Sequence, residues 1–202
     1  MLCVSRKSEA DVLIIGSGIA GLSAALAAAD RGLDTVVVSC APEIDESNSV
    51  HAQGGIIYRA LTGDPAQLEK DIADAGARVN YPPALKQLCE LGPKLVEDIL
   101  IRRAEVPFDR DAQGNLDLIR EGGHSSDRII HRGDESGRAI EQSMLRVCQA
   151  HQKIHFISGT TAVNLLMTSF HAKDATTRFE ESRCFGAFLY DQVQHEVYPL
   201  TA

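Results

Sequence analysis

Apolar and polar positions alternate along the chain in blocks whose lengths predict an α/β fold. The continuous apolar runs Val12–Ile15 and Thr35–Val38 are typical of strands buried on both faces of a parallel sheet. The alanine-rich run Leu22–Arg31 between them predicts a helix that ends at Gly32. A strand, a helix and a second strand in this order indicate a parallel sheet covered by helices.

Farther along, helical periodicity gives way to a return to β structure. Helices are expected over Asp64–Ala77, Pro83–Leu91, Pro93–Arg103 and Gly137–Ala150. Because proline removes a helical hydrogen bond, Gly92–Pro93 should break or kink the run that contains it. Strands or hairpins are expected over Glu105–Arg120, Ile154–Ile157, Thr160–Ser169, Cys184–Tyr190 and Gln194–Leu200. The later strands predict a β-meander beside the parallel sheet.

The first apolar run ends in a glycine motif, with the residues Gly16, Ser17, Gly18, Ile19, Ala20 and Gly21. Gly16 permits a tight turn, Gly18 lets the backbone approach a pyrophosphate, and Gly21 lets the next helix pack closely. The helix would direct its free N–H groups and positive dipole end at the phosphates. With a strand before it and a helix and strand after it, the motif predicts a Rossmann-like, dinucleotide-binding domain rather than packing glycines alone.

Bulk composition narrows the possible partners. The formal net charge is −8 and no basic stripe is visible, which argues against nucleic-acid binding. Residues 1–10 lack the apolar core of a signal peptide, and no uncharged run could span a bilayer, so a cytoplasmic protein without a membrane partner is expected. The five cysteines are widely separated and never form a CxxC pair, which favours reduced thiols and no metal.

A polar, glycine-ended loop follows the second strand and contains Asn48, Ser49, Val50, His51, Ala52, Gln53, Gly54 and Gly55. This segment resembles the flavin-contacting loop of the fumarate reductase, succinate dehydrogenase and L-aspartate oxidase superfamily of FAD enzymes. Consecutive small residues would let backbone amides and Gln53 approach the isoalloxazine ring and the pyrophosphate. The alternative is a structural turn.

The resemblance implies details of how FAD binds. Membrane-bound members tether the flavin through a histidine at the position of Asn48, and asparagine cannot form that bond, so noncovalent FAD is expected. Ser39 and Cys40 would lie on the adenosine side, although Ser39 could be an ordinary strand-end residue and Cys40 replaces a lysine common in the family. Backbone at Ala162 and Val163 would lie near the adenine.

A second block, Arg120–Arg138, resembles L-aspartate oxidases more than succinate dehydrogenases. By this resemblance Glu121 is the acid that contacts the amino group of a bound amino acid, and a carboxylate is a suitable partner for an ammonium group. His124 could orient the substrate or a loop. For both residues a structural hydrogen bond or salt bridge is the alternative. The arginines of this block could bind substrate carboxylates or form structural pairs; they are Arg120, Arg128 and Arg138.

The resemblance implies oxidation of L-aspartate, a dicarboxylate amino acid, to iminoaspartate by FAD, with dioxygen or fumarate as the electron acceptor. The product would serve NAD biosynthesis together with quinolinate synthase. A fumarate reductase or succinate dehydrogenase flavoprotein, a noncatalytic FAD-binding fragment and a nicotinamide-dependent domain are the alternatives.

The same resemblance predicts how much of the family pattern the chain contains. Residues 1–202 are expected to be the N-terminal part of an FAD-binding domain that is incomplete at its C-terminus. The capping domain and the helical domain would be absent. The catalytic arginine of the family would lie beyond Ala202, so the sequence assigns no catalytic residue within the chain.

Overall fold

The computed structural model describes residues 7–60, 65–171, 173–174, 176 and 179–202. The chain divides into two compact units, one of residues 1–48 and 145–202 and the other of residues 49–144. Each unit is described separately below. Asp64, the expected first residue of a helix, lies outside the described residues, as does Cys3.

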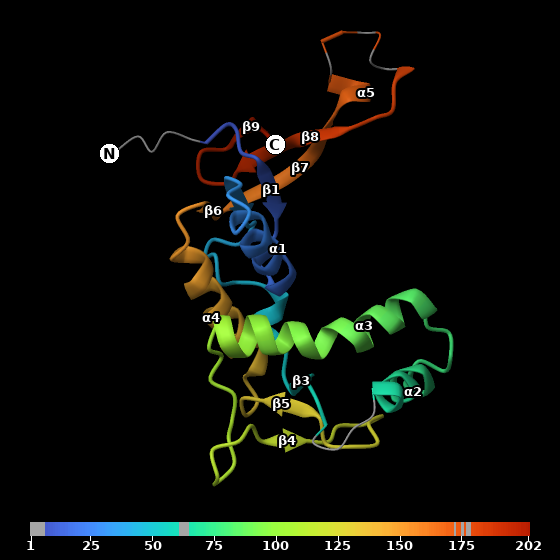
Figure 1. The fold of residues 1–202 in the computed structure, drawn as a ribbon. Helices are drawn as coiled ribbons and strands as arrows, with labels where there is room; N and C mark the ends of the chain where they lie inside the picture. Colours follow the sequence, from blue (N-terminus) through green and yellow to red (C-terminus); the bar gives the residue numbers. More distant parts are fainter. Residues whose placement is uncertain (1–6, 61–64, 172, 175, 177–178) are drawn as a thin grey trace. The chain divides into compact units, whose positions relative to one another are not determined.

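The first unit contains a parallel sheet in the order β1-β2-β6, formed by Val12–Ile15, Thr35–Val38 and Ile154–Ile157. Figure 1 labels its outer strands β1 and β6. All four residues of the central strand β2 are buried, as its apolar run predicts. The prediction of burial on both faces is wrong for β1, where Ile15 is 54% exposed. Within the described residues β1 pairs with β2 alone, so it is an edge strand of this sheet.

Helix α1, Ile19–Ala29, connects β1 to β2 and packs on the parallel sheet. Its buried residues recur at helical spacing and form one face; they are Leu22, Ala25, Leu26 and Ala29. The helix begins three residues before the expected start at Leu22 because Gly18 acts as its N-cap. The last residues of the glycine motif are therefore part of the helix. Cys148, near the end of α4 (Ser136–Gln149), donates a hydrogen bond to the Leu22 carbonyl at 3.6 Å.

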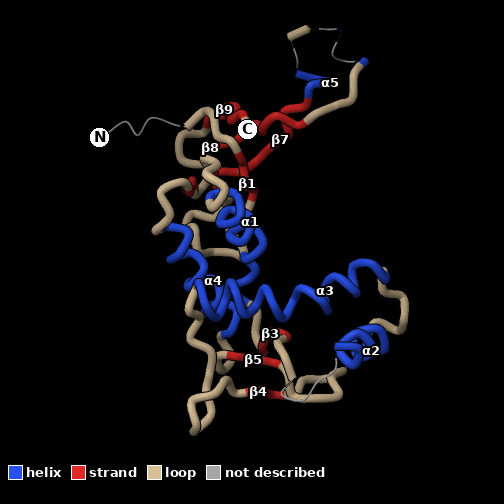
Figure 2. The backbone as a smooth tube through the Cα atoms, viewed as in Figure 1, coloured by secondary structure: helices blue, strands red, loops and turns tan. Residues whose placement is uncertain are grey.

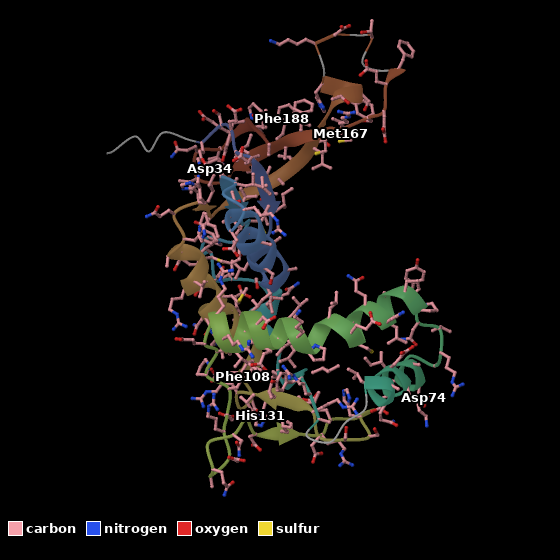
Figure 3. The ribbon with its side chains drawn as sticks, viewed as in Figure 1. Asp34, Asp74, Phe108, His131, Met167 and Phe188 are labelled. Carbon is pink, nitrogen blue, oxygen red and sulfur yellow. The ribbon has the colours of Figure 1, made fainter. Side chains whose placement is uncertain are left out.

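An antiparallel meander forms the second sheet of this unit, in the order β7-β8-β9. Its strands are Thr160–Met167, Cys184–Asp191 and Glu196–Thr201, and the short helix α5, Thr168–His171, follows β7. The two sheets share a core of Val36, Val38, Ala187, Leu189 and Leu200. Figure 3 labels Met167 and Phe188 on the paired strands β7 and β8. The expected hairpin is confirmed, and its buried residues lie against β2.

Ala202 follows directly after β9 and continues its pairing with β8. Its N–H donates to the Phe185 carbonyl at 3.0 Å, and the Thr201 N–H donates to the Ser8 carbonyl at 3.0 Å. These bonds give Ala202 a place in the backbone of the meander. The catalytic arginine that the family resemblance implies beyond Ala202 stays a prediction.

The second unit is built on a small antiparallel sheet in the order β3-β5-β4, shown in red in Figure 2. The strands are Gly55–Ile57, Ile129–His131 and Leu118–Ile119, and the 3₁₀ helix η1 comprises Asn48–His51. Helices α2, Pro65–Ala75, and α3, Pro82–Leu95, pack together through a small apolar core, whose buried members are Leu68, Leu85 and Cys89. Ile57 of β3 packs against this core.

A break or a kink is expected at Gly92–Pro93, and the break does not occur. Helix α3 continues through Pro93 to Leu95 and passes directly into the π-helical segment η2, Val96–Arg103. Gly92 has no side chain to clash with the proline ring, which removes one obstacle to helical backbone before a proline. The wider turns that follow include a hydrogen bond from the Ala104 N–H to the Ile99 carbonyl at 2.8 Å. The run therefore changes its pitch without ending.

The hairpin expected over Glu105–Arg120 forms only in part. The turn is present, with the Asp111 N–H donating to the Asn115 carbonyl at 2.8 Å and an isolated bridge between Arg110 and Leu116. Beyond this bridge, however, β4 pairs with β5 rather than with the preceding segment. Gly114 is a local signal for the turn, but the β5 partner lies outside the predicted hairpin.

Candidate functional site

The glycine loop of the first unit turns sharply at the carboxyl end of β1. Gly16 has a φ of +107° and its N–H donates to the Val38 carbonyl at 2.8 Å. A Cβ on Gly21 would lie 2.0 Å from the Gly16 carbonyl oxygen. A left-handed φ at Gly16 and close backbone contact at Gly21 both favour glycine. The packing role expected of Gly21 is therefore visible in the structure.

The start of α1 has the features of an anion-binding helix terminus. No side chain caps the helix at Gly18, and no acidic residue lies in its first turn. The positive end of the helix dipole is thus not neutralised locally. Ser17 is 3% exposed, and its Oγ has no hydrogen-bond partner among the described residues. A buried hydroxyl without a partner beside an uncapped helix fits a phosphate oxygen as its missing acceptor.

The carboxyl ends of the parallel strands meet beside this loop. The Ser39 N–H donates to the Ile157 carbonyl at 2.9 Å, and the Ser39 carbonyl accepts from the Thr160 N–H at 2.9 Å. Gln192 donates from Nε2 to the Cys40 carbonyl at 2.9 Å. Ligands of open α/β sheets bind outside the carboxyl ends of the strands. The structure brings Ser39 and Cys40 together with the start of β7, and it adds Gln192, which sequence analysis missed.

The pairing of β7 distinguishes the two positions expected near adenine. Ala162 pairs with Leu189 and packs against the shared core. The register then shifts to Asn164, and Val163 is 58% exposed at this irregularity. A residue at a bulge has backbone groups outside the strand ladder. The geometry therefore favours Val163 over Ala162 for backbone contact, while the adenine contact itself stays a prediction.

In the second unit, the expected flavin loop is fastened to the first turn of α4. The Gly137 N–H donates to the Ala52 carbonyl at 3.0 Å, and the Ala52 N–H donates to the Ser49 carbonyl at 3.2 Å. A Cβ on Gly137 would lie 2.1 Å from the Ser49 carbonyl oxygen. Sequence analysis missed Gly137 as a supporting residue. The sequence signal that could have indicated this close contact is a glycine at the second position of α4.

The loop ends in two glycines that the structure uses differently. Gly54 has a φ of +70°. Gly55 begins β3, where a Cβ would lie 2.3 Å from Cγ2 of Ile129. The preceding side chains are exposed; they are His51, Ala52 and Gln53. An exposed segment that is bonded to Gly137 through Ala52 and followed by Gly54 and Gly55 can present its backbone and Gln53 to a ligand.

The two candidate substrate residues share one loop. Glu121 is exposed, and its Oε1 accepts a hydrogen bond from the Gly55 N–H at 3.0 Å. The His124 N–H donates to the Glu121 carbonyl at 3.2 Å. His124 Nδ1 is buried and has no hydrogen-bond partner among the described residues. The structure thus brings Glu121 to the flavin loop and leaves one nitrogen of His124 available.

The three candidate arginines all form ion pairs within the protein. Arg120 Nε lies 2.9 Å from Asp127 Oδ1, and Arg128 Nη2 lies 3.1 Å from Asp71 Oδ2. Arg138 Nε lies 4.0 Å from Glu135 Oε2. Arg128 and Asp71 are buried, with exposed fractions of 2% and 7%. The buried pair favours the structural alternative for Arg128. The pairs of Arg120 and Arg138 are exposed, so a role of these two arginines towards substrate carboxylates stays a prediction.

Asp71 is held in its charged form by several donors. Burial alone would raise its pKa, but the N–H and hydroxyl of Ser125, the amide of Gln67 and the charge of Arg128 lower the pKa to about 2. Ser125 donates twice to Asp71 Oδ2, at 2.9 Å from N and 2.8 Å from Oγ. Asp71 consequently fixes the loop that carries Glu121 and His124.

This network predicts a pH dependence of stability. Because the pKa of Asp71 is lower in the folded state than the value of about 3.9 in an unfolded chain, its contribution is complete above that unfolded value. The contribution is lost as pH falls from about 4 towards 2, where the folded carboxylate becomes protonated. Urea unfolding between pH 5 and pH 2 should show this loss for the wild type. Asp71→Asn should reduce the slope in that window, and an unchanged slope would contradict the assignment.

His131, labelled in Figure 3 on β5, lies between two acids. Its Nδ1 is 3.4 Å from Asp109 Oδ2 and its Nε2 is 3.4 Å from Asp117 Oδ2. The Gly133 N–H and the Arg132 guanidinium both donate to Asp109 and hold the pKa of its carboxyl below the usual value. These contacts tie β5 to the preceding loop. Sequence analysis did not assign His131 a role.

A glycine loop between a parallel strand and an uncapped helix defines a nucleotide-binding α/β domain. The chain belongs to the FAD binding domain family, whose model matches residues 11–198. It is 36% identical over 160 residues to L-aspartate oxidase 2-a of Nicotiana tabacum, covering 78% of this chain and 24% of that protein. It is also 36% identical over 163 residues to L-aspartate oxidase of Halobacterium salinarum, covering 81% and 31%. The chain thus spans about a quarter to a third of these curated relatives.

Solved structures agree on the fold. The chain matches E. coli quinol-fumarate reductase with a TM-score of 0.83 at 19% identity, covering 98% of this chain and 32% of that one. A Mycobacterium smegmatis Sdh1 complex with UQ1 gives 0.82 at 22% identity, covering 98% and 33%. The expected α/β FAD-binding fold and FAD as the cofactor are confirmed. The protein is a flavoprotein of the FAD binding domain family.

Membrane-spanning helices, metal-binding clusters and disulfides are absent from the described residues. No helix among them has both the length and the apolar character needed to cross a membrane. In the same residues, no group of three or more histidine, cysteine, aspartate or glutamate side chains is arranged to hold a metal ion. No disulfide joins the cysteines that the structure describes; they are Cys40, Cys89, Cys148 and Cys184.

Proposed function

We propose that this chain is the FAD-binding part of an L-aspartate oxidase. The observation that carries the proposal is the match to curated L-aspartate oxidases, at 36% identity over about four-fifths of the chain. The position of Glu121 supports it, because an exposed acid at the expected flavin loop suits an amino-acid substrate better than a dicarboxylate without an amino group.

The residues present fit an FAD. In the first unit, the uncapped N-terminus of α1 and Ser17 Oγ would hold the pyrophosphate, and Ser39, Cys40 and backbone at Val163 would line the adenosine part. In the second unit, the segment from Ser49 to Gly55 would contact the flavin ring through its backbone and Gln53.

The bound flavin would supply the acceptor for a hydride from Cα of the amino acid. Glu121 would accept hydrogen bonds from the substrate ammonium group and thereby fix the orientation of the Cα–H bond. His124 would orient the substrate or this loop through Nδ1, which has no partner among the described residues. A dicarboxylate also needs cationic partners. Arg128 is held by the buried Asp71. The pairs of Arg120 and Arg138 are exposed, so these two arginines would be the available candidates among the three.

Anaerobic reduction of the FAD-loaded protein tests the reaction. L-Aspartate should bleach the flavin absorbance near 450 nm, while D-aspartate and succinate should not. Bleaching by succinate but not by L-aspartate would favour a fumarate reductase or succinate dehydrogenase flavoprotein. A yellow protein that no substrate bleaches would favour the noncatalytic FAD-binding fragment and would contradict an oxidase activity for this chain.

Noncovalent attachment of FAD is a separate prediction. Asn48 has no imidazole with which to form the tether expected from a histidine at this position. Acid precipitation of the yellow protein should therefore release all of the flavin into the supernatant, as measured by its absorbance. Flavin that stays with the precipitated polypeptide would contradict this prediction.

The wider biological setting follows from the same proposal. The product iminoaspartate would supply NAD biosynthesis together with quinolinate synthase, and either dioxygen or fumarate would reoxidise the flavin. A cytoplasmic location, with no nucleic-acid or membrane partner, stays a prediction from charge and composition.

A further inference from the structure

Glu121 makes a contact that a purely substrate-binding acid would not need. Its Oε1 accepts a hydrogen bond from the backbone N–H of Gly55 at 3.0 Å, across 66 residues of sequence. Gly55 is the last residue of the segment that resembles the flavin-contacting loop and the first residue of β3. We propose that Glu121 is a positioning residue for the flavin loop, in addition to its proposed role towards substrate.

The backbone around this contact is shaped to receive the carboxylate. Gly54 has a φ of +70°, and a Cβ at this position would lie 2.9 Å from Glu121 Oε1. Gly54 thus combines a left-handed backbone with an absence of side chain on the side where the carboxylate lies. A Cβ on Gly55 would instead meet Ile129 and the Ile130 carbonyl oxygen, so of the two glycines only Gly54 bears on the approach of Glu121.

The other end of the contact is also fixed. Arg120 and Asp127 flank the segment that carries Glu121, and because both side chains are exposed their pair at 2.9 Å adds little to the anchoring. Within that segment the Ser125 N–H and hydroxyl are bound by the buried Asp71. The carboxylate therefore extends from an anchored loop to the flavin loop. Its hydrogen bond to Gly55 can hold the flavin loop in a fixed position relative to the anchored loop.

The two carboxylate oxygens have different environments. Oε1 accepts from Gly55, whereas Oε2 accepts no hydrogen bond from the described residues. A charged acceptor can serve two donors at once, so Oε2 is available for an ammonium group while Oε1 holds the loop. This second consequence rests on the proposed function and couples amino-acid binding to the position of the loop. The positioning role itself requires no particular substrate.

Three variants separate the positioning role from general damage. Glu121→Ala removes the acceptor, Glu121→Gln keeps an oxygen that can accept from Gly55, and Asp127→Ala removes a neighbouring exposed carboxylate that binds Arg120 instead. Two readouts are used on the purified chain: hydrogen exchange of the Gly55 amide by NMR without FAD, and the FAD dissociation constant by flavin fluorescence. Circular dichroism establishes that each variant is folded.

Glu121→Ala should speed exchange of the Gly55 amide and weaken FAD binding by about five- to tenfold, because a charge-assisted hydrogen bond to the loop is lost. Glu121→Gln keeps a neutral acceptor and should weaken FAD binding by no more than about threefold. Asp127→Ala removes an exposed ion pair and should change FAD affinity by less than about twofold. Unchanged Gly55 exchange in Glu121→Ala would overturn the contact, whatever the fate of FAD binding. Unchanged FAD affinity in Glu121→Ala, or an equal loss in Glu121→Gln, would overturn the positioning role.

Failure of the proposed function gives a different pattern. A wild-type chain that binds FAD but is not reduced by L-aspartate leaves the positioning result intact and removes the coupling to an amino acid. If Glu121→Ala weakens FAD binding as stated, the FAD affinity of the wild-type chain should also rise in the presence of L-aspartate. FAD affinity that does not change with L-aspartate would overturn the coupling and retain the positioning role.

Discussion

Replacing Gly21 with alanine should lower FAD affinity by about a hundredfold, equivalent to roughly 3 kcal/mol. The added Cβ would lie 2.0 Å from the Gly16 carbonyl oxygen, so either the helix or the glycine turn must move. Both elements are expected to face the pyrophosphate, and a shift of either removes backbone N–H groups from position. The dissociation constant for FAD, measured by fluorescence titration, reports this loss.

Ala24→Ser is the matched control for Gly21→Ala. Ala24 lies on the same helix but is exposed, so a serine there should leave FAD affinity within about twofold, since surface substitutions have small effects. Circular dichroism of both variants shows whether the fold survives. A folded Gly21→Ala variant that binds FAD like the wild type would show that the turn at Gly16 does not contact the cofactor.

Removing the Asp71 side chain as Asp71→Ala should lower the free energy of unfolding by about 3–5 kcal/mol. The change would leave Arg128, which is 2% exposed, without its carboxylate partner and would release both hydrogen bonds to Ser125. An unpaired buried charge is far more costly than the loss of a surface ion pair. Urea denaturation followed by circular dichroism measures the difference.

Asp74 provides the comparison on the same helix, and Figure 3 labels it on α2. Its carboxylate pairs with Arg78 at 3.1 Å, but both side chains are largely exposed, with exposed fractions of 47% and 78%. Asp74→Ala should therefore change stability by no more than about 0.5 kcal/mol. If Asp71→Ala were as mild as Asp74→Ala, the buried pair would not anchor the loop that carries Glu121.

Local sequence signals were sufficient for the nucleotide-binding part of the fold. The apolar runs of β1 and β2 and the glycine motif between them specify a strand, a turn and a helix over neighbouring residues, and the structure has all three. The meander was also predictable, because β8 and β9 are adjacent in sequence and joined by a turn at Asp191. In each case the interactions that decide the structure are local.

The rest depends on contacts that local patterns do not encode. Strand β5 is three residues long and has partners on both sides, β3 and β4, of which β3 lies far away in sequence. The Gly55 contact of Glu121 and the burial of Arg128 against Asp71 likewise join segments separated by more than fifty residues. At Pro93 a strong local signal favours a helix end, but the helix continues to Leu95 and then changes to π-helical turns.

Equilibrium titration of the purified chain with FAD, in the presence and absence of excess NAD⁺, tests the central claim most directly. The account predicts that one FAD binds per chain, shifts its visible absorption on binding, and is retained when NAD⁺ is added. A chain that leaves the flavin spectrum unchanged, or that releases FAD in exchange for NAD⁺, would contradict the assignment of its glycine loop to a flavin cofactor.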